Sequence, residues 1–325
     1  MVNPSLQQPL DSKHRIQCFF SLFSKFTMWF KNVRFFRLHP DWTADTIDAQ
    51  VAKHAFTPGS SQEPLSLGWA PAHDQTDLVH RVNGQILLTA KAEKKLLPST
   101  VINQIARARA KDKEAEQGYK VGRKQMKELK EDLITELLPR AFSIERLVSV
   151  WIDPEHRWLA IDAAAAATAD EIMGLIAKTF EIFPAVPVYT HQSPATAMTG
   201  WLADFSLPYP FSIDQDAELR GSGESRSVVR YAHHNLDSDE VRNHIAEGKQ
   251  CTRLALTWAD KISFVLTDGL ELKRVAPTDV LTEQQEQDSQ DEAHVFDAEF
   301  LLMSSDLHVL LSELLDALGG EKTTV

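Results

Sequence analysis

The chain has 325 residues and carries 34 Lys and Arg against 46 Asp and Glu, which gives a formal net charge of -12 at pH 7. The 43% hydrophobic and 25% charged residues exclude a disordered chain, a collagen-like repeat and a coiled-coil rod. At about 150 residues per domain, the length predicts two domains or three. The only cysteines, Cys18 and Cys251, exclude a disulfide framework and a cysteine-based zinc site, so a reducing, cytoplasmic setting fits best.

The N-terminal segment imitates a signal peptide, because the apolar residues 18–30 follow basic residues. Lys25 interrupts the apolar run and no small-residue cleavage site follows it, which disfavours secretion. The alternative is that translation starts at Met28, where strand-like sequence begins, and that residues 1–27 are a disordered extension. No uninterrupted apolar run reaches about 18 residues, so the sequence predicts no transmembrane helix and no membrane partner.

The first part of the chain predicts a strand over residues 29–38 and a helix over residues 43–54. A β-hairpin follows over residues 78–97. Its centre is Asn83-Gly84, a pair that favours a type I′ turn because both residue types tolerate positive φ.

The composition changes at Ser99, where Lys, Arg, Glu, Gln and Ala become frequent and β-branched residues become rare. Residues 99–138 therefore predict two long helices that break between Gly118 and Gly122, with Ser99 as an N-cap. Pro139 ends the second helix because proline cannot continue it.

The remaining elements are predicted in chain order. The first are a hairpin over 147–161 with its turn at 153–156, a helix from Thr168 to about Phe180, a strand over 185–189 and a helix over 193–201. A loop-rich boundary over 206–227 separates them from a short helix opened by Ser238 and a hairpin over 251–266 continued by 270–275. The last are an acidic linker over 283–292, a strand over 298–303, and a helix over 305–318 stopped by Gly319-Gly320. Hairpins that alternate with helices predict an α+β fold with mainly antiparallel sheets.

The charge distribution is the most informative feature of the sequence. Residues 91–130 hold 12 basic and five acidic residues, a local charge of +7, which leaves -19 for the rest of the chain. A solvated helical face could carry such a run without any ligand. Clustered Lys and Arg in an otherwise acidic chain also suit a surface that neutralises the phosphates of nucleic acid.

Catalytic and metal-binding motifs are missing from the sequence. There is no Walker A loop, because Gly221–Ser225 lacks the lysine, and there is no H-E-x-x-H motif. The prediction is therefore no enzyme, no catalytic residue, no cofactor and no metal. Two sets of possible ligands are interpreted as loop residues without fixed geometry: His73, Asp74, Asp77 and His80, and His233, His234, Asp237 and Asp239.

Phe142 follows the second predicted helix in the segment LLPRAFS. One interpretation places its ring in a small local core at the helix stop. The other leaves it exposed at the end of the helical arm, where an aromatic side chain can dock against another subunit.

Several short segments occur in a characteristic order between Met28 and Glu321: MWFKN, AFTP, NGQI, KLLPSTVI, LLPRAFS, NHI-A-E-G-K, LALTW, FDAEF and LLDALGGE. In this order they resemble the recombination-associated protein RdgC family of bacterial nucleoid proteins. The resemblance implies a ring-shaped homodimer that encircles double-stranded DNA with little sequence preference, with single-stranded DNA as a further possible partner. It also implies functional antagonism of the RecA recombinase, no catalytic role, and a cytoplasmic, nucleoid-associated location.

The resemblance assigns residues by motif. The LLPRAFS match implies that Arg140 and Phe142 lie at the dimer interface, and the NHI-A-E-G-K match implies that Lys249 contacts DNA. The DNA contacts predicted from the basic segment and from the residues flanking the third hairpin are Lys91, Lys94, Lys95, Lys124, Lys127, Arg230, Lys249 and Arg253.

The predicted organisation has a central α+β domain formed by residues 28–98 and 147–205, a basic helical arm over residues 99–146, and a C-terminal α+β domain over residues 206–325. A second functional hypothesis is a protein-interaction scaffold that acts directly on the recombinase, with incidental affinity for DNA.

Overall fold

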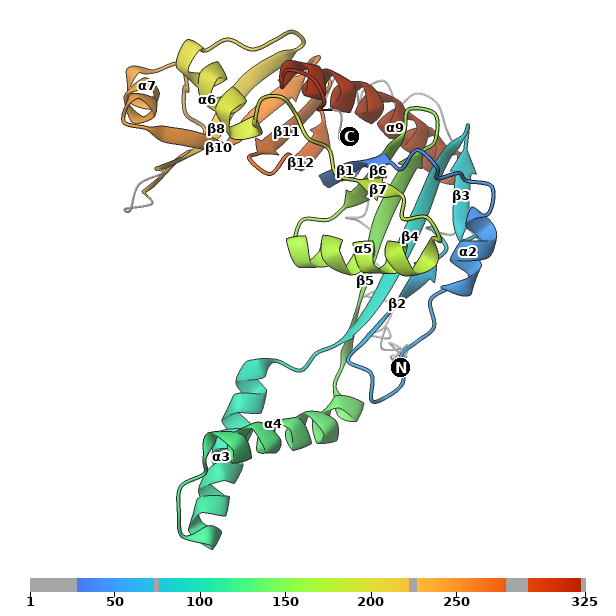
Figure 1. The fold of residues 1–325 in the computed structure, drawn as a ribbon, viewed down its shortest axis with the longest axis vertical. Coiled ribbons are helices and arrows are strands. Elements are labelled where there is room, and N and C mark those ends of the chain that lie inside the picture. The colour runs from blue at the N-terminus through green and yellow to red at the C-terminus, as the bar shows by residue number, and fades with distance from the viewer. Residues whose placement is uncertain (1–27, 73–75, 222–226, 279–291, 323–325) are drawn as a thin grey trace, which may run out of the picture.

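A computed structural model describes residues 28–72, 76–221, 227–278 and 292–322 (Figure 1). The predicted extension over residues 1–27 and nearly all of the predicted acidic linker lie outside these described residues.

The described strands form one 12-stranded sheet in the order β2-β4-β5-β6-β1-β12-β11-β10-β8-β9, with β3 paired to β4 and β7 paired to β1. Every strand pairing is antiparallel. The strands are β1 (Asn32–Leu38), β2 (Leu65–Ala70), β3 (Val79–Val82), β4 (Gln85–Lys95), β5 (Ser143–Asp153), β6 (Trp158–Asp162), β7 (Ala185–Val186), β8 (Phe211–Gly221), β9 (Val228–Tyr231), β10 (Lys249–Trp258), β11 (Ile262–Thr267) and β12 (Leu272–Pro277).

Helices cover parts of both faces of this sheet, so the predicted α+β class with a mainly antiparallel sheet is confirmed. The helices are α2 (Ile47–Lys53), α3 (Ser99–Gln117), α4 (Arg123–Leu137), the 3-10 helix η1 (Leu138–Arg140), α5 (Ala166–Thr179), α6 (Pro194–Asp204), α7 (Asp239–Ala246) and α9 (Glu292–Ala317).

The apolar pattern of β6 shows how the sheet separates two cores. Trp158 and Ala160 belong to the core that contains the buried face of α9, whereas Leu159 and Ile161 belong to the core under α2 and α5. Since successive side chains of a strand point to opposite faces, four successive buried apolar residues mean that the strand is covered on both sides. β6 therefore lies between two helical layers.

The molecule is an arc with a different kind of structure at each end (Figure 1). One end is the C-terminal lobe, made of β8 to β12 with α6, α7 and α9. The other end is the helical hairpin α3–α4, which projects from the long strands β4 and β5. Between them, β1 joins β12 through Asn32 opposite Lys273 and Val33 opposite Leu272.

The predicted hairpins are confirmed, and their turns follow from local chemistry. Asn83 and Gly84 have φ of 47° and 81°, as a type I′ turn requires. In the turn after β5, the Asp153 carboxylate accepts from the backbone N–H groups of Glu155 and His156 at 3.0 Å each. The predicted break between the two long helices is also present, with Gly118 in the left-handed region as the C-cap of α3.

The loop-rich boundary predicted over residues 206–227 is wrong, because residues 211–221 form the long strand β8. Alternate residues of β8 are polar and face away from the core, so the segment has few consecutive apolar residues. The strand predicted over residues 298–303 is also wrong, because it lies inside the helix α9. A short apolar run does not distinguish a buried strand from a buried helix.

Smaller errors concern helix starts and one strand length. Ser99 is the first residue of α3 and makes no capping bond, and α5 begins at Ala166, before the predicted start at Thr168. The strand predicted over residues 185–189 is limited to the two residues of β7. The predicted division into domains stays a prediction.

Candidate nucleic-acid interface

Two arginines bind one buried carboxylate at the end of the C-terminal lobe, and a third arginine lies opposite it on the neighbouring strand. Glu218 on β8 lies opposite Arg230 on β9 and opposite Arg253 on β10, and Arg220 is two residues further along β8. Ala217 and Leu219 point into the core, so Glu218 and Arg220 point to the other face of the sheet. We call Arg220, Arg230 and Arg253 the arginine cluster.

Glu218 orients two members of this cluster. Its side chain is only 4% exposed, and its two oxygens accept from the Nε atoms of Arg220 at 2.7 Å and Arg230 at 2.6 Å. Burial raises the pKa of Glu218, but the bonds from Arg230 and Arg220 outweigh burial and hold the pKa below its usual range.

The arginine side chains themselves face solvent, since those of Arg220 and Arg230 are 49% and 72% exposed. Among the hydrogen bonds of the described residues, each of these two guanidinium groups uses only its Nε atom. The outer nitrogens can therefore donate to an incoming phosphate. Arg253 is exposed as well.

The same strand is acidic toward its other end. Asp214 accepts from the Thr257 hydroxyl at 3.1 Å, and Asp216 accepts from the backbone N–H of His233 at 3.0 Å. Burial, together with the charge of Asp216, raises the pKa of Asp214 despite its bond from Thr257. Arg274 pairs with Asp216 at 3.4 Å and balances its charge, so a polyanion on this face would be attracted by the arginine end and would meet an unbalanced carboxylate only at Asp214 among these described residues.

Lys249 is less available than the sequence suggested. Its side chain is 11% exposed, and its ammonium lies 2.6 Å from Glu247 and 2.9 Å from Nδ1 of His244. The hydrogen bond from Lys249 is the main reason that the pKa of Glu247 is lowered. Contact with a phosphate would compete with this existing ion pair.

The lysines at the base of the helical hairpin also differ in their surroundings. Lys91 pairs with Glu145 at 2.9 Å and lies 5.0 Å from the ring centre of Phe56. Lys94 is exposed and Lys95 is half-buried, and neither ammonium has an ion-pair partner among the described residues. Lys94 and Lys95 are therefore the most available cations of this group.

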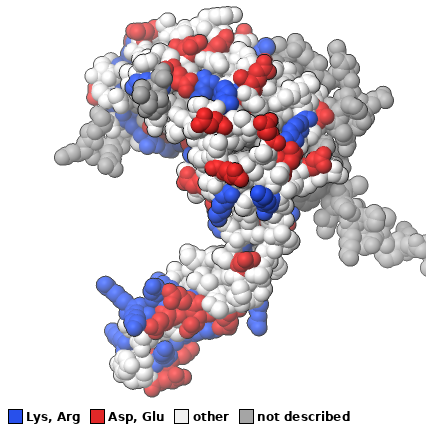
Figure 2. All heavy atoms as spheres, turned by 45° about the vertical axis from the view of Figure 1, so that its right-hand side comes forward, with Lys and Arg blue, Asp and Glu red and all other residues white. Residues whose placement is uncertain are grey.

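The helical hairpin carries basic and acidic side chains side by side, as Figure 2 shows on one face of the molecule. Lys124 is exposed, and Lys127 is exposed with Glu131 at 3.6 Å. Arg109 on α3 pairs with Glu136 on α4 at 2.8 Å. The excess of positive charge is thus spread over a mixed surface.

Phe142 lies outside any local core, because it is 84% exposed. The backbone N–H of Leu96 donates to the carbonyl of Phe142 at 2.7 Å, where the chain enters and leaves the helical hairpin. Phe142 is thus at the base of the hairpin, not at its far end. Leu96, Ile144 and Arg140 are exposed near it in the chain.

Neither set of possible metal ligands considered from the sequence is assembled within the described residues. His80 instead bonds to Asp297 on α9 at 2.9 Å, and His73 and Asp74 lie outside the described residues. His233 and His234 do not converge with Asp237 and Asp239.

Sequence reasoning missed Glu218 and Arg220, because it treated their segment as a loop. The available signal was the alternation in Asp214-Gln215-Asp216-Ala217-Glu218-Leu219-Arg220, where polar residues recur at every second position.

Comparison with known proteins identifies the class of protein to which this chain belongs. Residues 28–321 match the family model described as "Putative exonuclease, RdgC". Proteins named "Recombination-associated protein RdgC" from Bordetella parapertussis and Cupriavidus necator are 55% and 54% identical over 297 residues, which cover 91% of this chain and 99% of each relative. A relative of the same name from Burkholderia cenocepacia is 50% identical and is covered to 97%.

The chain belongs to the RdgC family of recombination-associated proteins. The resemblance inferred from the ordered short segments is thereby confirmed. No described helix is long and apolar enough to span a bilayer.

Proposed function

We propose that this protein is a non-catalytic DNA-binding protein that encircles duplex DNA as a homodimer and restrains recombination promoted by RecA. The proposed location is the cytoplasm, in association with the nucleoid. The observation that carries the DNA-binding part is the arginine cluster, in which a buried carboxylate presents solvent-facing guanidinium groups on the sheet face opposite the core.

The overall charge suits binding by a limited part of the surface. A protein of net charge -12 repels phosphate over most of its surface, so binding must use local basic areas. The arginine cluster and the lysines at the base of the helical hairpin are two such areas, and they belong to different parts of the arc (Figure 1). Two separated basic areas on a curved molecule suit a rod-like polyanion.

Binding of this kind needs no base recognition. Arginine and lysine contacts to phosphates fix position on a duplex without reading its sequence. The exposed ring of Phe142 supplies an apolar contact for a second copy of the chain. In a two-fold dimer the same patch is used twice, so one side chain contributes two anchors.

The test is a titration of duplexes of graded length and unrelated sequence with the purified protein at two salt concentrations. Gel electrophoresis of the same DNA after incubation shows whether it has been shortened. The proposal predicts salt-dependent binding of similar strength on each sequence and intact DNA after incubation with Mg²⁺. Shortened DNA would instead support the nuclease activity named in the family description.

A parallel measurement separates the alternative scaffold function. Binding of the protein to RecA is measured without DNA. Tight association with RecA, together with duplex binding that does not depend on salt, would favour the scaffold.

A further inference from the structure

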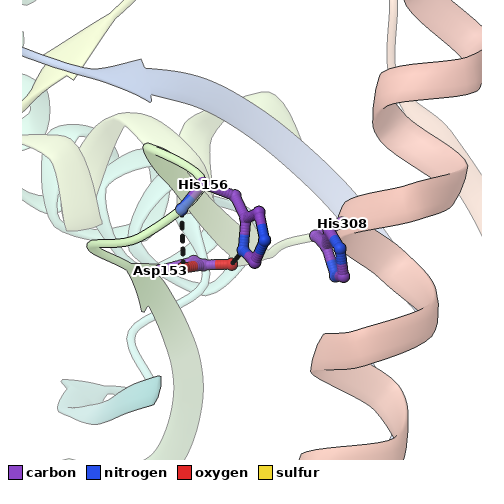
Figure 3. Close-up of side chains that lie close together, drawn as sticks. All are labelled: Asp153, His156 and His308. Carbon is purple, nitrogen blue, oxygen red and sulfur yellow. Dashed lines mark hydrogen bonds and ion pairs between the residues drawn. The ribbon is translucent and has the colours of Figure 1, made fainter. Parts of the chain in front are cut away.

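Two potential metal ligands at the β5–β6 turn meet a third from the distant helix α9 (Figure 3). Asp153 ends β5, His156 lies in the following turn, and His308 lies in α9. The ligand atoms of these three residues all lie within 4.8 Å of one another. One carboxylate and two imidazoles are a ligand set typical of Zn²⁺ and related transition metals.

The Asp153 carboxylate is fixed before any ligand arrives. Its side chain is fully buried, and Oδ1 accepts from the two backbone N–H groups of the turn. Oδ2 faces Nδ1 of His156 at 2.8 Å. A carboxylate held through one oxygen leaves the other to bind a cation, and such supporting bonds are usual for metal ligands in proteins.

The two histidines remain open to a ligand. Their rings stack with centres 4.0 Å apart and an interplanar angle of 19°. The side chain of His156 is 40% exposed, so its ring has room to turn. Within the described part of the chain, the ring nitrogens of His308 have no hydrogen-bond partner.

The positive charge of Arg37, which contacts the turn, is balanced by a carboxylate. Arg37 donates to the carbonyl of His156 at 3.1 Å, and its guanidinium also lies 3.5 Å from the ring centre of Trp158. Its Nε atom pairs with Glu321 at 2.9 Å. A divalent ion at the three ligands would therefore meet one carboxylate charge and little net repulsion from Arg37.

We propose that Asp153, His156 and His308 form a Zn²⁺-binding site that links the β5–β6 turn to α9. On binding, Oδ2 of Asp153 and one nitrogen of each neutral histidine bond to the ion, and water completes the coordination; where Nδ1 of His156 is the ligand atom, its proton moves through solvent to Nε2, so the imidazole stays neutral. Ligand atoms around tetrahedral zinc are about 3.3 Å apart, so the His156 ring must turn out of the stack to reach this geometry. The site is structural and is independent of the proposed DNA-binding function.

The test uses full-length protein without an affinity tag, stripped with chelator and titrated with Zn²⁺ against a chromophoric chelator. The variants are His308→Ala and His156→Asn, and the matched control is His191→Ala, an exposed histidine outside the cluster. Circular dichroism establishes that each variant is folded.

We expect one equivalent of Zn²⁺ to bind the wild type and the control. Affinity should fall at least about tenfold in each of the two cluster variants. The thermal midpoint of the wild type should rise by roughly 3–6 °C at a hundredfold excess of Zn²⁺ over the dissociation constant. Absence of binding to the wild type, or equal binding to the folded double variant His156→Asn/His308→Ala, would overturn the proposal.

Discussion

Replacing Glu218 by glutamine separates the positioning of the arginines from simple charge. The substitution removes one negative charge, so net charge alone predicts tighter binding to DNA. The structure predicts weaker binding. Glutamate gives the Nε–H groups of Arg220 and Arg230 one acceptor oxygen each, whereas glutamine has only one acceptor oxygen for both. At least one guanidinium then loses its fixed orientation.

The expected size follows from the contacts. Loss of one or two positioned arginines should make the slope of log K against log salt less steep by about 0.9 to 1.8. At 0.1 M salt we expect affinity to fall by about three- to tenfold, which corresponds to about 0.7 to 1.4 kcal/mol.

A matched control lies on the same strand. Asp214→Asn also removes one negative charge from β8, but Asp214 is held by the hydroxyl of Thr257 and orients no arginine. This variant should bind DNA as well as the wild type or slightly better. Fluorescence anisotropy on two unrelated duplexes over a range of salt concentrations measures both variants. If Glu218→Gln bound DNA more tightly, as Asp214→Asn is expected to, the positioning argument would be wrong.

The same carboxylate has a predictable effect on stability. Buried hydrogen bonds to charged groups contribute about 1.5–3 kcal/mol each. Because the side chains of Arg220 and Arg230 are about half exposed or more, solvent weakens their bonds to Glu218, and Glu218→Ala should lower the free energy of unfolding by only about 1–2 kcal/mol. Because the folded pKa of Glu218 is lowered, this stabilisation is complete above its unfolded pKa of about 4.3 and is lost as the pH falls through the folded pKa. Urea denaturation at pH 7 and pH 3 should show the difference between wild type and variant shrinking in acid.

Three further predictions concern other parts of the chain. Lys94→Ala/Lys95→Ala should make the slope of log K against log salt less steep by up to about two. Lys249→Ala should change this slope less, because the Lys249 ammonium already has a carboxylate partner. Equal slopes for the two variants would contradict this ranking. Phe142→Ala should leave the thermal midpoint within about 1 °C because the ring is exposed, while the dimer measured by analytical ultracentrifugation should weaken; a large fall in the midpoint would mean that the ring is part of the core. Burial raises the pKa of Cys251 to about 12, so its thiol should not react with iodoacetamide in the native protein at pH 8. Mass spectrometry should find the Cys251 peptide unmodified before unfolding and modified after it. Rapid labelling of the native protein would refute this.

The sequence predicted those features that local chemistry determines. Asn83-Gly84 defines its turn through backbone preferences that need no tertiary contact. The helices α3 and α4 follow from composition and from the glycines between them. The ordered family segments identified the family correctly.

The errors arise where tertiary contacts decide the outcome. The alternation along β8 is a weak signal because Gln215 is polar as well, and the pairing with β10 is what establishes the strand. The burial of Glu218 depends on its neighbours on β9 and β10, which are distant in the sequence. His308 was not singled out, because its proximity to His156 is created only when α9 packs against the β5–β6 turn.

The central claim is that the protein encircles duplex DNA, and topology tests this claim directly. Protein is loaded on a closed circular duplex at low salt, the salt concentration is raised, and the protein still bound is measured before and after one double-strand cut by a restriction enzyme. Encirclement predicts retention on the closed circle at high salt and rapid loss after the cut, with the DNA otherwise intact. Equal dissociation from closed and cut DNA would contradict encirclement.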